Sequence, residues 1–135
     1  MTSTERREVD VAIVGCGSAG ITARRAAKKA GASLLLIDPG PFGTTCARVG
    51  CMPSKALIAA ADAAHAVHSA AEFGVSAEGV RIEGRAVFER VRRYRDGFVG
   101  SVQRAVDDYE ADGELLVGRA EIVGEGRLLV DDALE

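Results

Sequence analysis

The chain of 135 residues has the length of one domain, and its hydrophobic fraction of 47% is sufficient for a core. A formal net charge of −3 offers no basic surface for DNA or RNA, which argues against a nucleic-acid partner. The first ten residues lack the apolar run of a signal peptide, and no segment has the unbroken apolar length of a membrane helix. We therefore expect a cytoplasmic protein without a membrane partner.

The first elements in chain order predict a βαβ unit. The β-branched, apolar run at residues 9–14 is typical of a buried parallel strand. A glycine-rich turn follows, and a helix is expected from about residue 18 to 30, with Gly31 placed to end it. Residues 33–38 predict a second buried strand, closed by a turn at 39–41. Two such parallel strands are joined by a right-handed crossover.

The middle of the chain predicts a loop and two helices. The loop spans residues 42–52, and a helix should begin with proline at its first position and cover residues 53–72, before Gly74. After a connection at residues 75–84, a long helix is expected to end at Gly113. Its apolar residues are three to four apart, which predicts one buried stripe. The stripe consists of Val87, Val91, Tyr94, Phe98, Val102, Ala105 and Tyr109.

The last part of the chain predicts short strands at residues 115–117, 120–123 and 127–130, and the last two are joined by residues 124–126. Taken with the βαβ unit, this order predicts an α/β fold with a Rossmann-like dinucleotide-binding domain. Such a domain would combine a parallel sheet, covering helices and a small β-meander.

The glycine-rich turn, Gly15-Cys16-Gly17-Ser18-Ala19-Gly20, follows the pattern G-x-G-x-x-G between a predicted strand and a predicted helix. Gly15 permits a tight turn, Gly17 would let the backbone approach a pyrophosphate, and Gly20 would let the helix pack closely on the sheet. The start of the helix offers free N–H groups to phosphates. Asp38, at the end of the next strand, is placed to accept hydrogen bonds from a ribose and would repel a 2′-phosphate.

An ordinary strand–turn–helix with incidental glycines is the alternative. The correct register of strand, helix and acidic residue disfavours it. The turn does not by itself distinguish FAD from NAD. Cys16 is interpreted as a small buried residue beside the turn.

Cys46 and Cys51 are separated by four residues. In a regular helix their Cα atoms would lie about 8.6 Å apart, whereas a disulfide needs roughly 4.4–6.8 Å. The pair can therefore bridge only in a loop or a distorted turn, which Gly50 and Pro53 favour. Cys51 precedes the predicted helix, whose dipole would favour its thiolate. Lys55 falls in the first turn of that helix, where a cation is mildly unfavourable. An anionic neighbour would explain its presence there.

Two alternatives for the cysteines are unlinked core residues and ligands of a metal ion. Zinc sites usually add a second pair of ligands, for which Cys16, His65 and His68 remain. The histidines lie one turn apart on an alanine-rich helix, which favours a solvated or lightly packed face. No metal site is predicted, and the chemistry of the loop leaves redox activity open.

Residues 43–55 read Gly-Thr-Thr-Cys-Ala-Arg-Val-Gly-Cys-Met-Pro-Ser-Lys. They resemble the redox-active signature of the class I pyridine nucleotide-disulfide oxidoreductases, G-G-T-C-x-N-x-G-C-x-P-S-K. The resemblance covers essentially the whole chain, including the segment Gly118-Arg119-Ala120. Two departures, Thr44 for the second glycine and Arg48 for asparagine, bear on how the loop would meet flavin or substrate.

The resemblance implies a role for each matching position. Cys46 would be the interchange thiol that attacks a substrate disulfide, and Cys51 the thiol lying against the flavin. FAD would be bound by Gly15, Gly17, Ser18, Ala19 and Gly20 at the pyrophosphate, Asp38 at the adenosine ribose, Thr45 and Lys55 elsewhere on the cofactor, and the backbone of Ala120 at the adenine. The implied activity passes electrons between a dithiol and NAD or NADP through the cysteine pair and FAD.

The pair Ser54-Lys55 is closer to the lipoamide and mercuric branches of the family than to the glutathione branch. A dihydrolipoamide-type substrate is therefore expected, either free or carried on a lipoyl domain. Reduction of a soft metal ion and a nucleotide-binding module without turnover stay open. Residues 1–135 are expected to form the N-terminal FAD-binding segment of a longer, homodimeric parent. The NAD-binding domain, the returning FAD segment and the dimerisation domain are absent from them, so they should be inactive alone.

Overall fold

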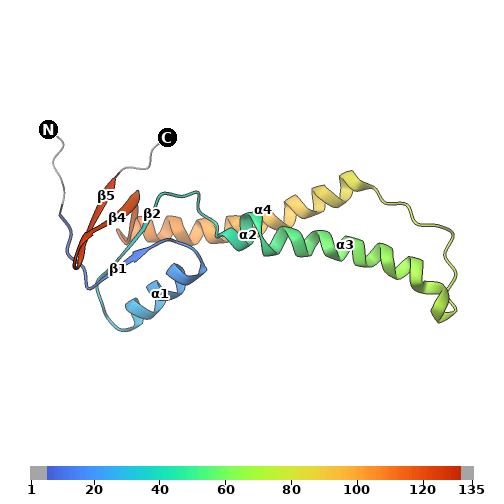
Figure 1. Cartoon of the computed structure of the whole chain (residues 1–135), viewed down its shortest axis with the longest axis horizontal. Coiled ribbons are helices and arrows are strands. Elements are labelled where there is room, and N and C mark those ends of the chain that lie inside the picture. Colours follow the sequence, from blue (N-terminus) through green and yellow to red (C-terminus); the bar gives the residue numbers. More distant parts are fainter. Residues whose placement is uncertain (1–5, 132–135) are drawn as a thin grey trace. The chain divides into compact units, whose positions relative to one another are not determined.

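The structure is a computed structural model that describes residues 6–131 (Figure 1). Its elements in chain order are β1 (Val11–Val14), α1 (Ser18–Lys29), β2 (Leu34–Asp38), α2 (Thr45–Val49), α3 (Cys51–Ser69), a 3₁₀ helix (Ala70–Phe73), α4 (Gly84–Ala111), β3 (Leu115–Val117), β4 (Arg119–Gly124) and β5 (Arg127–Asp131). They divide into two compact units. The sheet unit contains residues 6–42 and 102–131, and the helical unit contains residues 43–101.

The sheet unit has the predicted α/β fold. Its three strands are all parallel in the order β1-β2-β3, and Leu36 of the central strand lies in register with Ile13 on one side and Leu115 on the other. Residues 34–37 of the central strand β2 are all buried. A strand of a parallel sheet that is covered on both faces has a continuous apolar run rather than an alternating one. Strands β4 and β5 form a separate antiparallel hairpin, whose turn contains Gly126 at a φ of +63°.

The core of the sheet unit lies between its sheet and the end of α4. Its buried members are Ile13, Cys16, Leu36, Val106, Tyr109 and Leu115. Cys16 is only 3% exposed, which confirms its interpretation as a small core residue. The helix α1 follows the predicted bounds closely, and Gly31, just beyond it, adopts a φ of +75°.

An ionic cluster around the buried Arg24, which the sequence did not reveal, joins α1 to the rest of the sheet unit. The Arg24 guanidinium is stacked 3.7 Å from the centre of the Tyr109 ring and forms an ion pair with Glu114. Lys28, one turn further along α1, adds ion pairs of 2.8 Å to Glu114 and 3.3 Å to Asp112. The turn between α4 and β3 is thereby joined to α1, the helix that begins at the glycine-rich turn.

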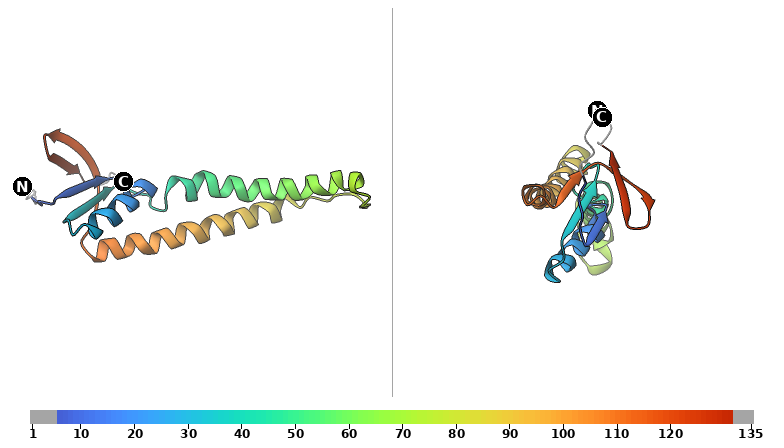
Figure 2. Two further views of the ribbon diagram at one scale, coloured as in Figure 1. Left: turned by 90° about the horizontal axis from the view of Figure 1, so that it is seen from below. Right: turned by 90° about the vertical axis from the view of Figure 1, so that its left-hand side faces the viewer.

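In the helical unit, α3 and the first part of α4 run alongside each other in opposite directions (Figure 2). The Arg90 side chain donates a hydrogen bond of 3.0 Å to the carbonyl oxygen of Ala56. The predicted start of α3 was two residues late, because Pro53 is its third residue. The first-turn N–H groups of a helix have no partner within the helix, so proline is tolerated there. Gly74 ends the following 3₁₀ helix with a φ of +74°, as expected.

The expectation of one buried stripe on α4 was wrong at Tyr94 and Phe98, which are 48% and 43% exposed. Of the other predicted members, Val91 and Tyr109 are buried, and Val87, Val102 and Ala105 are half-buried. Apolar spacing shows which side chains share a helix face, and it does not show what covers that face. The Arg90 guanidinium lies 4.7 Å from the Tyr94 ring centre. Within residues 6–131, none of the helices combines the length and the mean hydropathy that a membrane span requires.

Candidate functional site

The predicted site residues form two groups, one in each unit. The sheet unit holds Gly15, Gly17, Ser18, Ala19, Gly20, Asp38 and Ala120, and the helical unit holds Thr45, Cys46, Cys51 and Lys55.

The glycine-rich turn adopts the conformation that its glycines suggested. Gly15 has a φ of +99°, and its N–H donates a hydrogen bond of 2.8 Å to the Ile37 carbonyl. A Cβ at Gly20 would collide with the carbonyl oxygen of Gly15 and lie 3.4 Å from Cγ2 of Ile13. Only glycine therefore allows α1 to pack this closely on the turn. A Cβ at Gly17 would meet no atom within 4 Å, so the space beside its backbone is open.

The start of α1 suits an anionic ligand. Gly17 is its N-cap, and no side chain of the described residues caps it there. Its first turn carries no acidic residue, and Ser18 and Ala19 are exposed. Unpaired N–H groups and the partial positive charge of the helix dipole favour a phosphate at such an end. The open space at Gly17 and the uncapped helix together fit a dinucleotide pyrophosphate.

Asp38 connects the turn to the strands around it. One carboxylate oxygen accepts the Cys16 N–H at 2.6 Å and the other accepts the Gly40 N–H at 2.7 Å. Its carbonyl oxygen accepts the Gly118 N–H at 3.3 Å. Ala120 lies two residues further on, in β4. Because each carboxylate oxygen has two lone pairs, these bonds leave Asp38 able to accept a ribose hydroxyl as well.

The cysteine pair is carried by two helices. Cys46 is half-buried in α2, and Cys51 is exposed as the first residue of α3. Gly50 separates the helices, so the pair does not lie in one regular helix, as the distance argument required. The expectation of a loop was incomplete, since residues 45–49 are helical. Both side chains carry free thiols, and a hydrogen bond joins them.

The first N–H groups of α3 point at Cys46. Hydrogen bonding with the Cys51 thiol, partial burial and repulsion from an ionised Cys51 raise the pKa of Cys46 above its usual 9.0. The backbone N–H groups of Cys51 and Met52 donate to the Cys46 sulfur and act in the opposite direction. The sequence suggested that the α3 dipole would serve Cys51, whereas the structure places these donors at Cys46.

Three further residues lie close to the cysteine pair in the sequence. Lys55 lies four residues after Cys51 and thus on the same face of α3, and Thr45 is the exposed first residue of α2. Thr44, which precedes α2, has a φ of 59°, in a region that costs about 1–3 kcal/mol for a residue with a Cβ. Its hydroxyl accepts the Ala47 N–H at 3.2 Å. Sequence reasoning missed this cap, although threonine just before a short helix could have indicated it.

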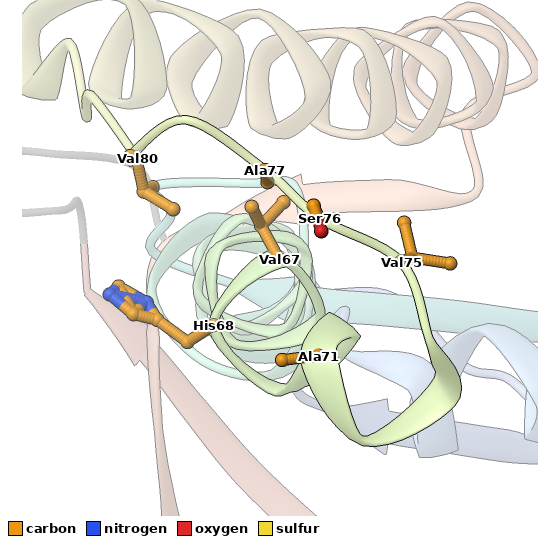
Figure 3. Close-up of a pocket in the computed structure, with 8 residues that line it drawn as sticks. Val67, His68, Ala71, Val75, Ser76, Ala77 and Val80 are labelled. Carbon is orange, nitrogen blue, oxygen red and sulfur yellow. The ribbon is translucent and has the colours of Figure 1, made fainter.

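A pocket of about 320 Å³ lies at the far end of the helical unit (Figure 3). Val67, His68 and Ala71 line one side, and Val75, Ala77 and Val80 of the following connection line the other. No predicted site residue lines this pocket. His65 and His68 are exposed, and among the described residues no three potential ligands gather into a metal site.

Residues 9–134 match the family described as pyridine nucleotide-disulphide oxidoreductase. Dihydrolipoyl dehydrogenase of Halobacterium salinarum is 37% identical over 123 residues, which cover 90% of this chain and 25% of that protein. A dihydrolipoyl dehydrogenase of Bacillus subtilis is 31% identical over 122 residues, covering 90% of this chain and 24% of its own length. Mercuric reductase of Streptomyces lividans is 45% identical over 64 residues, 47% of this chain and 14% of that protein.

The chain thus spans about a quarter of the length of the dihydrolipoyl dehydrogenases that it matches. The family that the cysteine motif suggested is confirmed, because the match begins before β1 and extends past β5. The chain belongs to the pyridine nucleotide-disulphide oxidoreductase family.

Proposed function

We propose that this chain supplies the FAD-binding segment and the redox dithiol of a flavoprotein disulfide oxidoreductase that uses NAD or NADP. The observation that carries the proposal is the hydrogen-bonded pair Cys46–Cys51, placed where the first N–H groups of α3 serve the Cys46 sulfur. The uncapped start of α1 and the open space at Gly17 support a bound dinucleotide in the same chain.

The proposed cofactor contacts follow the two groups of residues. The glycine-rich turn, with Ser18 and Ala19, would hold the pyrophosphate of FAD through backbone N–H groups. Asp38 would accept the adenosine ribose, and the Ala120 backbone would contact the adenine. Thr45 and Lys55 would contact the flavin end. When bound, FAD supplies the two-electron redox chemistry that side chains lack.

The residues of this chain carry the thiol–disulfide exchange. The Cys46 thiolate attacks one sulfur of a substrate disulfide, the substrate S–S bond breaks, and one substrate sulfur leaves as a thiolate that takes up a proton. Cys51, as a thiolate, then attacks the Cys46 sulfur of the mixed disulfide and releases the second substrate thiol. The substrate disulfide is reduced to a dithiol and the cysteine pair is oxidised to a disulfide. Oxidation of a dithiol is the same sequence in reverse.

Dihydrolipoamide is the proposed substrate, free or carried on a lipoyl domain, and the parent protein is proposed to act as a homodimer. The similarity to dihydrolipoyl dehydrogenases over 90% of the chain supports this choice. The second candidate is a reductase of a soft metal ion held by the two thiols. It is favoured by the 45% identity to a mercuric reductase over 64 residues.

Purification of the parent protein that carries this segment tests the cofactor. It should be yellow and should release FAD on denaturation, and stoichiometric NAD without flavin would contradict the proposal. The 135-residue chain alone should bind FAD weakly and should not turn over NADH with lipoamide. These 135 residues contain one glycine-rich turn of the dinucleotide-binding pattern, at residues 15–20. NADH would therefore lack a second such site to position its nicotinamide against the flavin.

Two substrates and three variants test the chemistry. The parent protein is assayed for NADH or NADPH oxidation with lipoamide and, separately, with Hg²⁺. Cys46→Ser and Cys51→Ser should each abolish turnover, and Cys16→Ala serves as the matched control because Cys16 is 3% exposed in the core. Cys46→Ser should retain a thiolate–flavin absorbance band that Cys51→Ser loses. Equal spectra for the two variants would refute the assigned roles, and turnover with Hg²⁺ alone would select the second candidate.

A further inference from the structure

Thr44 holds an unusual backbone conformation. Among residues 6–131 it is the one non-glycine residue with a positive φ, and its φ of 59° and ψ of 146° lie near the region that glycine alone ordinarily occupies. The chain enters it from Gly43, where a Cβ would lie 2.8 Å from Cγ1 of Val99. The entry is therefore fixed by tight packing, and α2 begins at the very next residue, Thr45.

The side chain of Thr44 is tied to the helix that it precedes. Its hydroxyl accepts the N–H of Ala47 at 3.2 Å, and its carbonyl oxygen accepts the N–H of Arg48 at 3.0 Å. Ala47 is buried, with 6% of its surface exposed, so this end of the bond is held in place. These two bonds define the first turn of α2, and that turn contains Cys46.

The position of the Cys46 sulfur depends on this turn. The start of α3 lies directly against Cys46, because a Cβ at Gly50, the residue before α3, would be only 3.4 Å from the Cys46 Cα. Hydrogen bonds from the N–H groups of Cys51 and Met52, which belong to α3, act to lower the pKa of Cys46. Helix α2 has only five residues, and a helix this short has almost no stability of its own. A change in the first turn of α2 will therefore move the sulfur away from donors fixed in the other helix.

We propose that Thr44 is a positioning residue for Cys46: its hydroxyl holds the first turn of α2 so that the Cys46 sulfur stays at the N–H groups that begin α3. The importance of this for disulfide exchange rests on the proposed function. The geometry itself involves thiols and backbone only, so it can be tested without flavin. The strained φ is maintained because the hydroxyl forms a bond that glycine cannot form.

Alkylation by iodoacetamide measures the reactivity of each cysteine. The fully reduced chain is treated over a range of pH, digested with trypsin and quantified by mass spectrometry. Cleavage after Arg48 separates the cysteine pair, so the three cysteines fall on three peptides, residues 8–24, 30–48 and 49–55. The variants are Thr44→Ser, which keeps the hydroxyl, Thr44→Ala, which removes it, and Thr44→Gly, which removes both the hydroxyl and the strain.

Thr44→Ser should leave the pH profile of Cys46 alkylation unchanged. Thr44→Ala and Thr44→Gly should both displace it upward, because the thiolate loses the N–H donors. A displacement of one pH unit would slow alkylation at neutral pH about tenfold. Cys16 reports on folding, since it is 3% exposed and should stay protected in every variant that folds. A variant with reactive Cys16 is measured again at lower temperature, where the fold is retained.

An unchanged Cys46 profile in folded Thr44→Ala would overturn the proposal. So would a profile in Thr44→Ser that moves as far as in Thr44→Ala, or a normal profile in Thr44→Gly, since the hydroxyl would then not be the cause. The proposed function fails differently. If the parent protein lacks FAD or turnover while the Cys46 profiles follow the expectation, the function is wrong and the positioning role of Thr44 stands.

Discussion

The backbone of Gly50 lies against that of Cys46. A Cβ at Gly50 would be 3.4 Å from the Cα of Cys46 and 3.2 Å from the carbonyl oxygen of Thr45. Such distances are shorter than most contacts of a real side chain, so the two helices meet this closely because residue 50 has none. The approach brings the first N–H groups of α3 within reach of the Cys46 sulfur.

Gly50→Ala should therefore weaken the dithiol site. The added methyl group will push α2 and α3 apart by a few tenths of an ångström, and overpacking of this kind costs about 1–3 kcal/mol. We expect a lower melting temperature and slower oxidation of the Cys46–Cys51 pair by glutathione disulfide. Both are measured on the 135-residue chain, the second by loss of free thiols in the two tryptic peptides.

Gly97→Ala is the matched control. Gly97 lies inside α4, and a Cβ there would meet no atom within 4 Å. Alanine is the better helix former, so this variant should be more stable by about 0.5–1 kcal/mol and should oxidise at the normal rate. Oxidation of Gly50→Ala at the wild-type rate would show that the close approach of Gly50 to Cys46 has no bearing on the thiols.

The order and type of the main elements could be predicted from local patterns. The apolar runs gave β1 and β2, Gly31, Gly74 and Gly113 marked helix ends, and all three glycines have positive φ. The cysteine segment was less predictable. Residues 45–49 have no apolar periodicity long enough to indicate a helix, and its first turn depends on the Thr44 hydroxyl.

Long-range polar contacts could not be predicted at all. The Arg24 cluster joins residues that are about ninety positions apart, and no local pattern relates α1 to the turn before β3. The exposure of Tyr94 and Phe98 was missed for a similar reason, since periodicity carries no information about the surface opposite a helix. For Asp38, the sequence indicated its place at the end of a strand. It did not indicate the two N–H groups that donate hydrogen bonds to its carboxylate.

Asp38→Asn should destabilise the glycine-rich turn. The carboxylate accepts one N–H with each oxygen, from Cys16 and from Gly40. An asparagine has one acceptor oxygen, so its NH₂ group would face one of these two N–H groups. That N–H group would then have no acceptor. The cost should be about 1–3 kcal/mol of unfolding free energy, measured by urea denaturation of the chain. In the parent protein, FAD binding should weaken as well, as measured by fluorescence titration of the apoprotein.

Asp10→Asn is the matched control for Asp38→Asn. Asp10 also accepts a backbone N–H, that of Ser33 at 2.8 Å, but it is exposed and lies at the opposite end of β1 from the turn. It should lower stability less than Asp38→Asn and leave the affinity for FAD unchanged. Equal losses of FAD affinity in the two variants would contradict a specific role for Asp38.

The same Asp10 variant tests a pH effect. Hydrogen bonds from the Ser33 hydroxyl and then the Ser33 N–H lower the pKa of Asp10 below its usual 3.8. The folded state thus holds this proton less tightly than the unfolded state. Asp10 therefore contributes stability that is fully present above about pH 4 and is lost as the pH falls through the lowered pKa. The difference in unfolding free energy between wild type and Asp10→Asn should shrink between pH 5 and pH 2, as measured by urea denaturation. A constant difference would contradict the assignment.

Arg24→Ala should destabilise the sheet unit more than any other variant considered. The guanidinium is buried, with 7% of the residue exposed, and it stacks on Tyr109 while pairing with Glu114. Its removal takes one cation from the half-buried Glu114 carboxylate, which keeps its ion pair of 2.8 Å with Lys28. Loss of one partner of a buried ion pair costs about 3–5 kcal/mol, and the Lys28 pair should keep the loss near the lower value.

Two further variants separate charge from packing at this position. Arg24→Lys keeps the cation but loses the planar stack on Tyr109, so its unfolding free energy should fall between wild type and Arg24→Ala. Arg25→Ala removes the neighbouring, exposed arginine of the same helix and should change stability by less than about 0.5 kcal/mol. All three are measured by urea denaturation at pH 7. Because α1 begins at the glycine-rich turn, Arg24→Ala should also weaken FAD binding by the parent protein, while Arg25→Ala should not. Equal effects of Arg24→Ala and Arg25→Ala on stability would mean that the buried cluster does not hold α1 in place.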